Sequence, residues 1–566
     1  MTYRHFKCEG WLYTFAFLLA LALRLTQLGV MPLNDAEAAP ALQALHIAQG
    51  VRPALSPHPF YILSTSVLFF LYGGGTNFLA RLIPALIGSL LVFAPLLFDN
   101  RLKPRPSLLL AFFIALDPGL TALSRQAASP IFAVTFFLFA WAYIHKNKAS
   151  LAGFFAALAL LSGPSIWPGL LGLGITWAIF QGFNFRRPSQ PSTADSQPSA
   201  LSTSIFNSSI LFPFLITFIT FGTLFFIVPN GLSAALASIP AFFNTWLTSS
   251  DVSAGRLLLS LLVYQPLAFL LALIAIIRGW TNGSARIIPL SIWLFVSLLL
   301  AVFLPSRQIS DLVWVLIPLC TLAALELTRG FNIFPDERRE VIGVVLLTAL
   351  IWLFAWLDFT GLVWLPVNSR EYVMRFWLLI SALILLVLSL LLVAAGWSIR
   401  TARLGGVWGL TLVLGVLGFG GTLGSTGLRG LAHPEFWWPS SMPMQADLLQ
   451  ATVREISEFG VGNEFSAPVV IMGINSPALE WALREHSVSE VESLDISSAP
   501  YFIVTPPQTD PVLVSAYRGQ DFTWRQTPLW NAALPNDWIR WITLREMPQT
   551  GETIILWARD DLFLDK

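Results

Sequence analysis

Long apolar runs recur along the whole sequence, and they constrain the fold more than any other feature. An α-helix rises 1.5 Å per residue, so about 20 apolar residues are enough to cross a bilayer. Of the 566 residues, 55% are hydrophobic and 11% are charged, whereas soluble domains carry about 25% charged residues. The sequence therefore predicts a polytopic α-helical membrane protein. About 13 runs are candidate transmembrane helices, at residues 11–30, 80–98, 107–123, 130–145, 151–163, 166–180, 210–228, 257–277, 287–304, 312–327, 341–357, 376–397 and 405–420.

Lysine and arginine are divided unevenly between the loops that join these runs. With the amino terminus inside, one set of loops holds pairs or triplets, such as Lys146 with Lys148. The other set holds mostly single arginines, namely Arg52, Arg125, Arg256, Arg307 and Arg370. Cytoplasmic loops carry the excess of lysine and arginine. We therefore expect the chain in the cytoplasmic membrane, with everything after about residue 421 on the outer side.

Composition divides the chain into two domains. Residues 1–430 form the predicted transmembrane domain, which is interrupted at 186–204 by a Ser- and Pro-rich segment that reads as a flexible cytoplasmic linker. Residues 431–566 have ordinary composition, with helical periodicity at 444–459 and 477–486 and strand patterns at 468–474, 501–505, 522–526 and 553–558. We expect a small extracytoplasmic α/β domain that acts as a lid or docking domain.

Charge and cysteine content exclude other classes of protein. The net charge is +1, which does not provide the basic face that a nucleic acid requires. Cys8 and Cys320 are the only cysteines, so the sequence contains neither a disulfide framework nor a cysteine metal cluster.

Two acids, Asp35 and Glu37, follow directly on the first apolar run. Carboxylates at the point where a chain leaves the bilayer lie near the head group of any lipid-borne substrate. A purely structural interpretation is also open, because Asn34 or Asp35 would serve as the N-cap of a helix at 36–48. A third acid, Asp117, is costly near the end of an apolar run unless it is partnered. We expect it to pair with Arg125.

Several short segments together resemble the GT-C membrane glycosyltransferases, the group that contains protein O-mannosyltransferases and the lipid A aminoarabinose transferase. The first is Asp35-Ala36-Glu37-Ala38, which is similar to the acidic motif of the first outer loop of that family. Four further segments follow in the expected order, at 80–88, at 117–119 with 124–125, at 151–162, and at 305–307 with 316–318. The chain departs from the pattern where Ala36 separates the two acids and where Ala127, Ala128 and Ser129 stand in place of a downstream acid.

The resemblance implies transfer of a sugar from a polyprenyl-phosphate carrier to an acceptor protein, lipid or glycan at the outer face of the membrane. Such a reaction needs a carboxylate to take the proton of the acceptor and cations to stabilise the departing phosphate. Asp35 and Glu37 are the candidates for the first role, and which of them is the base stays open. The candidates for the second role are Arg52, Arg81, Arg125 and Arg307.

The resemblance also allows a divalent cation, Mg or Mn, between Asp35 and Glu37, although two carboxylates are too few ligands to establish such a site. Two functions of other classes stay open beside the transferase. One is a transporter or flippase of lipid-linked sugars, although the sequence shows no evident repeat. The other is a non-catalytic assembly factor of the same fold, which the split acidic pair would suit.

Overall fold

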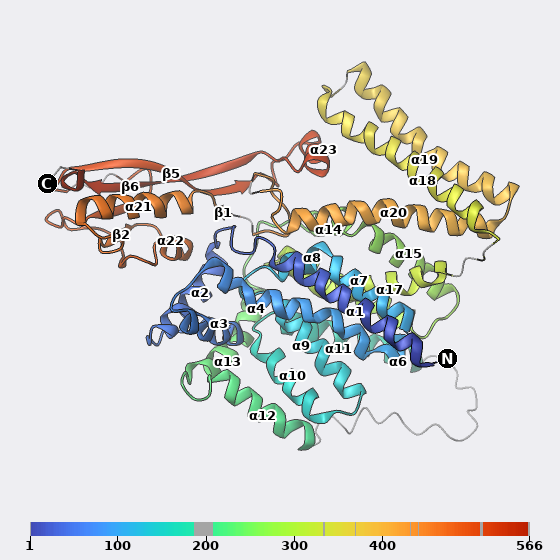
Figure 1. Cartoon of the computed structure of the whole chain (residues 1–566), viewed down its shortest axis with the longest axis horizontal. Helices are drawn as coiled ribbons and strands as arrows, with labels where there is room; N and C mark the ends of the chain where they lie inside the picture. Colours follow the sequence, from blue (N-terminus) through green and yellow to red (C-terminus); the bar gives the residue numbers. More distant parts are fainter. Residues whose placement is uncertain are drawn as a thin grey trace.

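The computed structural model describes residues 2–102, 104–185, 208–331, 334, 336–367, 369–430, 432–439, 441–509 and 513–563. The predicted linker at 186–204 lies outside these residues. Helices of the first 331 residues gather into one bundle (Figure 1). They are α1 (Thr2–Leu25), α2 (Asp35–Ala48), α3 (Pro59–Tyr72), α4 (Asn77–Leu90), α5 (Ala94–Leu97), α6 (Asp99–Leu102), α7 (Pro104–Leu116), α8 (Pro118–Leu123), α9 (Ile131–His145), α10 (Ala149–Leu161), α11 (Ile166–Phe185), α12 (Ser208–Gly222), α13 (Asn230–Asn244), α14 (Ala254–Tyr264), α15 (Pro266–Thr281), α16 (Ile287–Phe303) and α17 (Val313–Leu327).

Three long helices follow the bundle. α18 (Arg338–Gly361) and α19 (Arg370–Gly396) form a hairpin that projects away from it, and α20 (Ile399–Ser425) lies along it (Figure 1). Among the described residues, five stretches are long and apolar enough to cross a membrane, and α14 with α15 adds a sixth if that bent pair is one span. Six shorter apolar helices accompany them. The chain is thus a multi-pass membrane protein, while the expected number of thirteen spans stays a prediction.

Proline and glycine determine where several helices break. The predicted runs at 151–163 and 166–180 are two helices, α10 and α11, separated at Gly163 and Pro164 as expected. The run predicted as one span at 257–277 is bent, because α14 and α15 meet at an angle of 97°, and whether the pair crosses the membrane as one span stays a prediction. Pro266 begins α15 and disfavours helical geometry at the residue before it, and Gln265 accordingly has φ −117° and ψ 43°.

The C-terminal part folds into a six-stranded sheet in the order β1-β5-β6-β4-β2-β3. β2 is parallel to β3 and β4, whereas β6 is antiparallel to β4 and β5, and β1 is antiparallel to β5. All six predicted elements are present, and β1, β3 and α23 are additional. The elements are β1 (Met442–Pro443), α21 (Ala446–Val461), β2 (Val469–Met472), α22 (Pro477–Ala482), β3 (Val488–Val491), β4 (Phe502–Thr505), β5 (Tyr517–Pro528), α23 (Pro535–Leu544) and β6 (Gln549–Arg559).

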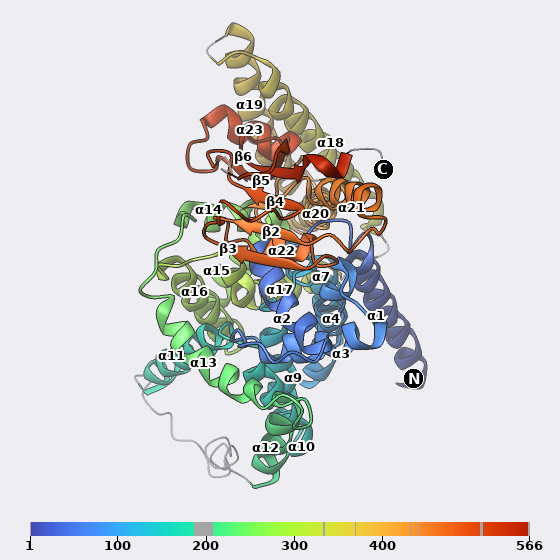
Figure 2. The same cartoon turned by 90° about the vertical axis from the view of Figure 1, so that its left-hand side faces the viewer.

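The sheet domain docks onto one end of the helix bundle, with α22 facing α2 (Figure 2). The indole Nε1 of Trp481 donates to Oδ1 of Asn77 at 2.8 Å, and Nε of Arg484 donates to the carbonyl of Gly75 at 2.9 Å. A Cβ at Gly75 would lie 2.8 Å from the Trp481 ring, so glycine is what permits this close approach. The loop between α3 and α4, together with the first residue of α4, therefore forms part of the contact with the sheet domain.

Candidate functional site

Glu37 lies in the first turn of α2, and the residues around it determine its position. Asn34 caps this helix, because its Oδ1 accepts from the backbone N–H groups of Ala36 and Glu37. The side-chain amide of Asn34 also donates to Oε2 of Glu37 at 2.6 Å. Of the two N-caps that the sequence allowed, Asn34 is the one used. It holds the Glu37 carboxylate as well as the backbone.

The Glu37 carboxylate is 4% exposed and accepts four hydrogen bonds from the protein. Arg81 donates from Nε to Oε1 at 2.9 Å and from Nη2 to Oε2 at 2.6 Å. The backbone N–H of Ala127 donates to Oε1 at 2.9 Å, and the Asn34 amide is the fourth donor. A carboxylate offers about four lone-pair positions, so protein donors fill all of them.

Arg81 is saturated in the same way. Its Nη1 donates to the carbonyls of Leu28 and Met31, and its Nη2 donates to the carbonyl of Pro32 as well as to Glu37. With Nε also bound to Glu37, all five N–H groups of the guanidinium have protein acceptors. In this arrangement Arg81 fixes Glu37 and the chain entering α2, and it has no donor left for a phosphate.

Asp35 points to a different set of partners. Its Oδ1 accepts from the hydroxyl of Ser476 at 2.6 Å and from the backbone N–H of Ala478 at 3.1 Å, and its Oδ2 pairs with Arg525 at 2.5 Å. All three partners belong to the sheet domain. Asp35 therefore joins the two domains, and the structure does not bring it together with Glu37.

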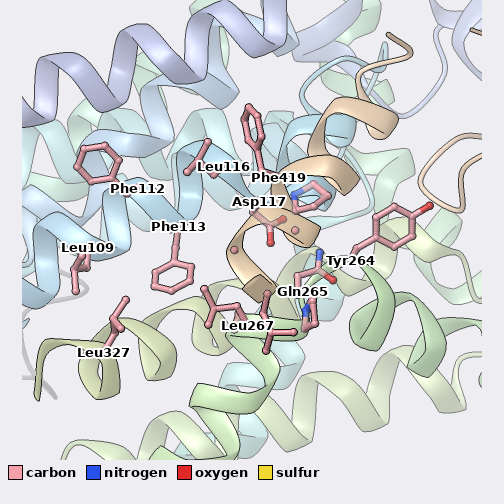
Figure 3. A pocket seen from close by; sticks show the side chains of 16 residues that line it. Leu109, Phe112, Phe113, Leu116, Asp117, Tyr264, Gln265, Leu267, Leu327 and Phe419 are labelled. Carbon is pink, nitrogen blue, oxygen red and sulfur yellow. The ribbon is translucent and has the colours of Figure 1, made fainter. Parts of the chain in front are cut away.

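Arg125 and Asp117 do not form the ion pair that we expected from the sequence. Arg125 donates to carbonyls at the end of α1, including Thr26 at 2.7 Å and Gln27 at 3.2 Å. Asp117 instead caps α8 through the backbone N–H of Leu120 at 2.8 Å. It lies beside Gln265 at one end of an apolar cavity of about 200 Å³ (Figure 3). Asp117 and Arg125 thus each satisfy backbone groups at a helix terminus. This arrangement costs less desolvation energy than a buried ion pair.

Neither Arg52 nor Arg307 is among the hydrogen-bond partners of Glu37. Arg52 is exposed in the loop after α2. Arg307 is half-buried, and its Nε donates to the carbonyl of Leu304 at 3.1 Å. Of the six residues predicted for the site, the structure brings only Glu37 and Arg81 into contact with each other.

A cavity of about 500 Å³ opens beside Glu37. Its walls come from the start of α2, the turn after α8, the loops on either side of the α14–α16 segment, and the segment that connects α20 to the sheet domain. Most of its polar groups are hydroxyls and amides. The lining includes Asn34, Ala36, Glu37, His58, Gln126, Ser129, Ser249, Ser250, Asp251, Arg256, Gln308, Ser310, Phe436, Trp437 and Trp438.

Arg256 is the site residue that sequence reasoning missed. It lies in the first turn of α14, is 7% exposed, and has a buried Nε without a hydrogen-bond partner. Within the described part of the chain, no acid forms an ion pair with it, although Asp251, which lines the same cavity, acts on it through its charge. Its guanidinium carbon lies 5.7 Å from the ring centroid of Phe436 and 5.4 Å from that of Trp530. The available signal was its place among the single arginines of the predicted outer loops, which does not distinguish it from Arg52 or Arg307.

His58 is a further titratable group in the cavity wall. Burial lowers the pKa of His58, although the contact with the Ser162 carbonyl acts in the opposite direction. Nδ1 lies 3.4 Å from that carbonyl, which can only accept a hydrogen bond, so Nδ1 carries the proton. The imidazole is therefore neutral at pH 7 and has its lone pair on Nε2.

The two carboxylates do not fit a shared divalent cation, because Asp35 is held by the sheet domain and Glu37 by Arg81. Across the described ranges, no group of three or more His, Cys, Asp or Glu side chains is placed to hold a metal ion. A metal role for this pair thus finds no support in the geometry.

Comparison with known proteins shows the fold. No family model matches the chain, and no curated protein matches its sequence. ArnT from Cupriavidus metallidurans bound to undecaprenyl phosphate is similar, with a TM-score of 0.58 and 14% identity over 98% of this chain and 99% of that chain. Apo ArnT from the same organism gives a TM-score of 0.50 and 13% identity over 88% of this chain and 94% of that one. The expected GT-C fold, with a small C-terminal sheet domain, is confirmed.

Proposed function

We propose that this chain, which has the fold of ArnT, is an integral membrane glycosyltransferase. It moves a hexosyl or pentosyl unit from a polyprenyl-phosphate donor to an acceptor at the outer face of the cytoplasmic membrane. One observation carries the proposal. The fold seen in a protein solved with undecaprenyl phosphate here contains a cavity with a buried carboxylate, Glu37, and an arginine, Arg256, whose Nε has no hydrogen-bond partner.

Arg256 is the residue that we assign to the donor phosphate. An arginine already paired with a carboxylate or with carbonyls has little to gain from a phosphate, and this applies to Arg81 and Arg125. Arg256 has aromatic rings beside it instead, and a charge-assisted hydrogen bond to phosphate would satisfy its Nε–H, which has no partner in the protein. Arg307 adjoins Gln308 of the cavity wall and adds positive charge nearby.

Glu37 is the carboxylate that we assign to the acceptor. As the sugar transfers, the bond between its anomeric carbon and the phosphate oxygen breaks, and a bond from that carbon to the acceptor oxygen forms. The acceptor proton passes to Glu37, and the electron pair leaves on the phosphate, which Arg256 stabilises. Glu37 needs a free lone pair for this step. The amide of Asn34 lines the same cavity and is the donor that makes way for the acceptor hydroxyl.

A transfer assay tests the proposal. Membranes containing wild-type protein, Glu37→Gln or Arg256→Gln would be supplied with labelled polyprenyl-phosphate sugar. We expect both variants to lose transfer by at least about 100-fold at unchanged protein level, whereas the exposed Arg370→Gln keeps it. His58→Gln and Asp251→Asn change the other two possible bases that line the cavity, and our assignment requires that both keep transfer while Glu37→Gln loses it. Retained transfer in Glu37→Gln would remove this carboxylate from the chemistry.

The sidedness of the cavity is a separate part of the proposal, supported by the distribution of lysine and arginine. Ser497→Cys on the sheet domain and Asn282→Cys after α15 are both exposed positions. In intact cells, a membrane-impermeant maleimide is expected to label the first and not the second. Labelling of Asn282→Cys alone would place the cavity on the cytoplasmic side.

A non-catalytic function is the second candidate, and the saturation of Glu37 and Arg81 favours it. Four donors on the carboxylate suit a structural role as well as a resting catalytic one. Binding of undecaprenyl phosphate to the purified protein, without turnover of any supplied lipid-linked sugar, would identify an assembly factor that kept the fold and lost the reaction.

A further inference from the structure

A second large cavity lies at the far end of the bundle from Glu37. The cavity beside Glu37 is lined by residues at the starts of α9 and α17, including Pro130 and Ser310. The distal cavity is lined by the other end of α9, at His145, by the start of α16, at Arg286, and by Leu325 near the end of α17. α9 has 15 residues, so at 1.5 Å per residue about 20 Å of helix separates the two cavities.

The distal cavity is almost entirely apolar. Its volume is about 280 Å³, whereas a single water molecule needs roughly 10–15 Å³ and several polar partners. Trp141 and Trp293 form part of its wall as an edge-to-face pair with ring centroids 6.0 Å apart. An empty cavity of this size would forfeit the dispersion energy of its whole lining. Hydrocarbon chains are the abundant apolar material around a membrane protein, so a lipid chain is the expected occupant.

The charges at the mouth indicate which lipid enters. Among the described residues no acid lines the cavity, whereas Arg286 does, and Lys146 follows the lining residue His145. Glu326, which adjoins Leu325 of the wall, forms an ion pair with Arg278 and is neutralised. Asp99, which adjoins Phe98, is the remaining acid beside the lining residues. Arg286 is exposed and has no ion-pair partner among the described residues, so the mouth keeps a positive excess.

We propose that this distal cavity binds an anionic phospholipid, with an acyl chain between α5, α7, α9, α16 and α17 and the phosphate beside Arg286. The inference does not rest on the proposed glycosyltransferase activity, because it needs only the membrane embedding. The lipid would brace the ends of α9 and α17, whose other ends line the cavity beside Glu37. Lipid binding therefore stabilises the positions of α9 and α17, on which the cavity beside Glu37 depends.

Thermal unfolding of the full-length protein in detergent tests this proposal, with added phosphatidylglycerol or phosphatidylcholine as the probe. We expect phosphatidylglycerol to stabilise the wild type more. Arg286→Gln should weaken the apparent affinity for phosphatidylglycerol about fivefold, which corresponds to the loss of about 1 kcal/mol from one surface cation. Arg339→Gln, an exposed arginine at the start of α18, is the matched control and should behave as wild type.

Native mass spectrometry adds an independent measurement on a variant that fills the cavity. Leu290→Trp places a larger side chain in the wall, and this variant should lose a co-purified phospholipid that the wild type and Arg339→Gln retain. Equal stabilisation by both lipids in wild type and Arg286→Gln would overturn the proposal. So would retention of the lipid by Leu290→Trp, or identification of the retained molecule as a polyprenyl phosphate.

Discussion

At the scale of single residues, burial determines what each ionisable group can do. Glu435, in the segment after α20, is 3% exposed and receives a hydrogen bond from the hydroxyl of Tyr264. Burial raises the pKa of Glu435, although Arg545, the Tyr264 hydroxyl and Arg429 act in the opposite direction. The carboxyl group thus keeps its proton in the folded protein at a pH where the unfolded chain has lost it.

A pH dependence of stability follows. An acid with a raised pKa in the folded state contributes stability below the ordinary glutamate pKa of about 4.3, and this contribution is lost as pH rises through the raised value. Unfolding temperatures measured across this range should fall with rising pH more steeply in wild type than in Glu435→Gln. Glu492→Gln, which changes an exposed glutamate, should keep the wild-type slope. Identical slopes for Glu435→Gln and wild type would contradict the assignment.

The roles of Asp35 and Glu37 illustrate what sequence can and cannot predict at this scale. The sequence placed both acids at the start of a helix that leaves the membrane. Two positions along a helix differ by about 200° in direction, so the acids point to opposite sides, and only the fold reveals which side holds the cavity. Similarly, the predicted membrane topology placed Arg81, Arg125 and Arg256 on the same face. The carbonyls that accept from Arg81 and Arg125, however, are far from both residues in the sequence.

At the scale of elements, one glycine allows α10 and α11 to meet beside the cavity. Gly163 has φ +108°, and a Cβ there would lie 2.5 Å from Nδ1 of His58 and 2.7 Å from the carbonyl of Pro57. Gly163→Ala should therefore destabilise the protein by roughly 1–3 kcal/mol, as measured by thermal unfolding in detergent. Gly174→Ala is the control, since a Cβ there meets no atom within 4 Å, and it should be neutral or slightly stabilising. A Gly163→Ala protein as stable as wild type would show that the turn relaxes freely.

Element boundaries followed from the sequence where a breaker residue is explicit, as at Gly163 and Pro164. The bend between α14 and α15 was missed although Pro266 was visible, because a proline inside a long apolar run is also tolerated in a kinked membrane helix. What decides the outcome is tertiary packing, since α14 and α15 both contact α20, and Tyr264, next to Gln265, accepts from the backbone N–H of Phe436 in the connecting segment. The short strands β1 and β3 were missed because neither has an alternating pattern long enough to recognise.

At the scale of the whole molecule, the sheet domain is attached through the acidic motif itself. Asp35 accepts from Ser476 and Ala478 at the start of α22 and pairs with Arg525 of β5. Asp35→Asn should loosen this attachment, by about 1–2 kcal/mol for a half-buried charged hydrogen-bond acceptor. Hydrogen exchange at 476–482 should become faster, while total protein level stays unchanged. Asp521→Asn, an exposed acid on β5, should leave the exchange unaltered, and equal rates in both variants would contradict a docking role.

The sheet domain also contacts the cavity arginine, because Trp530 lies beside Arg256 together with Phe436 of the connecting segment. A cation beside an aromatic face is stabilised by about 0.5–2 kcal/mol. Trp530→Ala should consequently weaken phosphate binding about fivefold, while Trp364→Ala, a tryptophan with 73% exposure, should not. Unchanged binding in Trp530→Ala would mean that Arg256 holds its position without the sheet domain.

Binding of undecaprenyl phosphate to purified wild type and Arg256→Gln tests the central claim most directly. Because Arg256 lines the cavity and its buried Nε has no hydrogen-bond partner, we predict that its loss weakens binding by about 10- to 100-fold, equivalent to one charged hydrogen-bonding contact. Arg370→Gln should bind as wild type does. Equal affinity of wild type and Arg256→Gln would contradict the account, because the cavity beside Glu37 would then not be where the lipid phosphate binds.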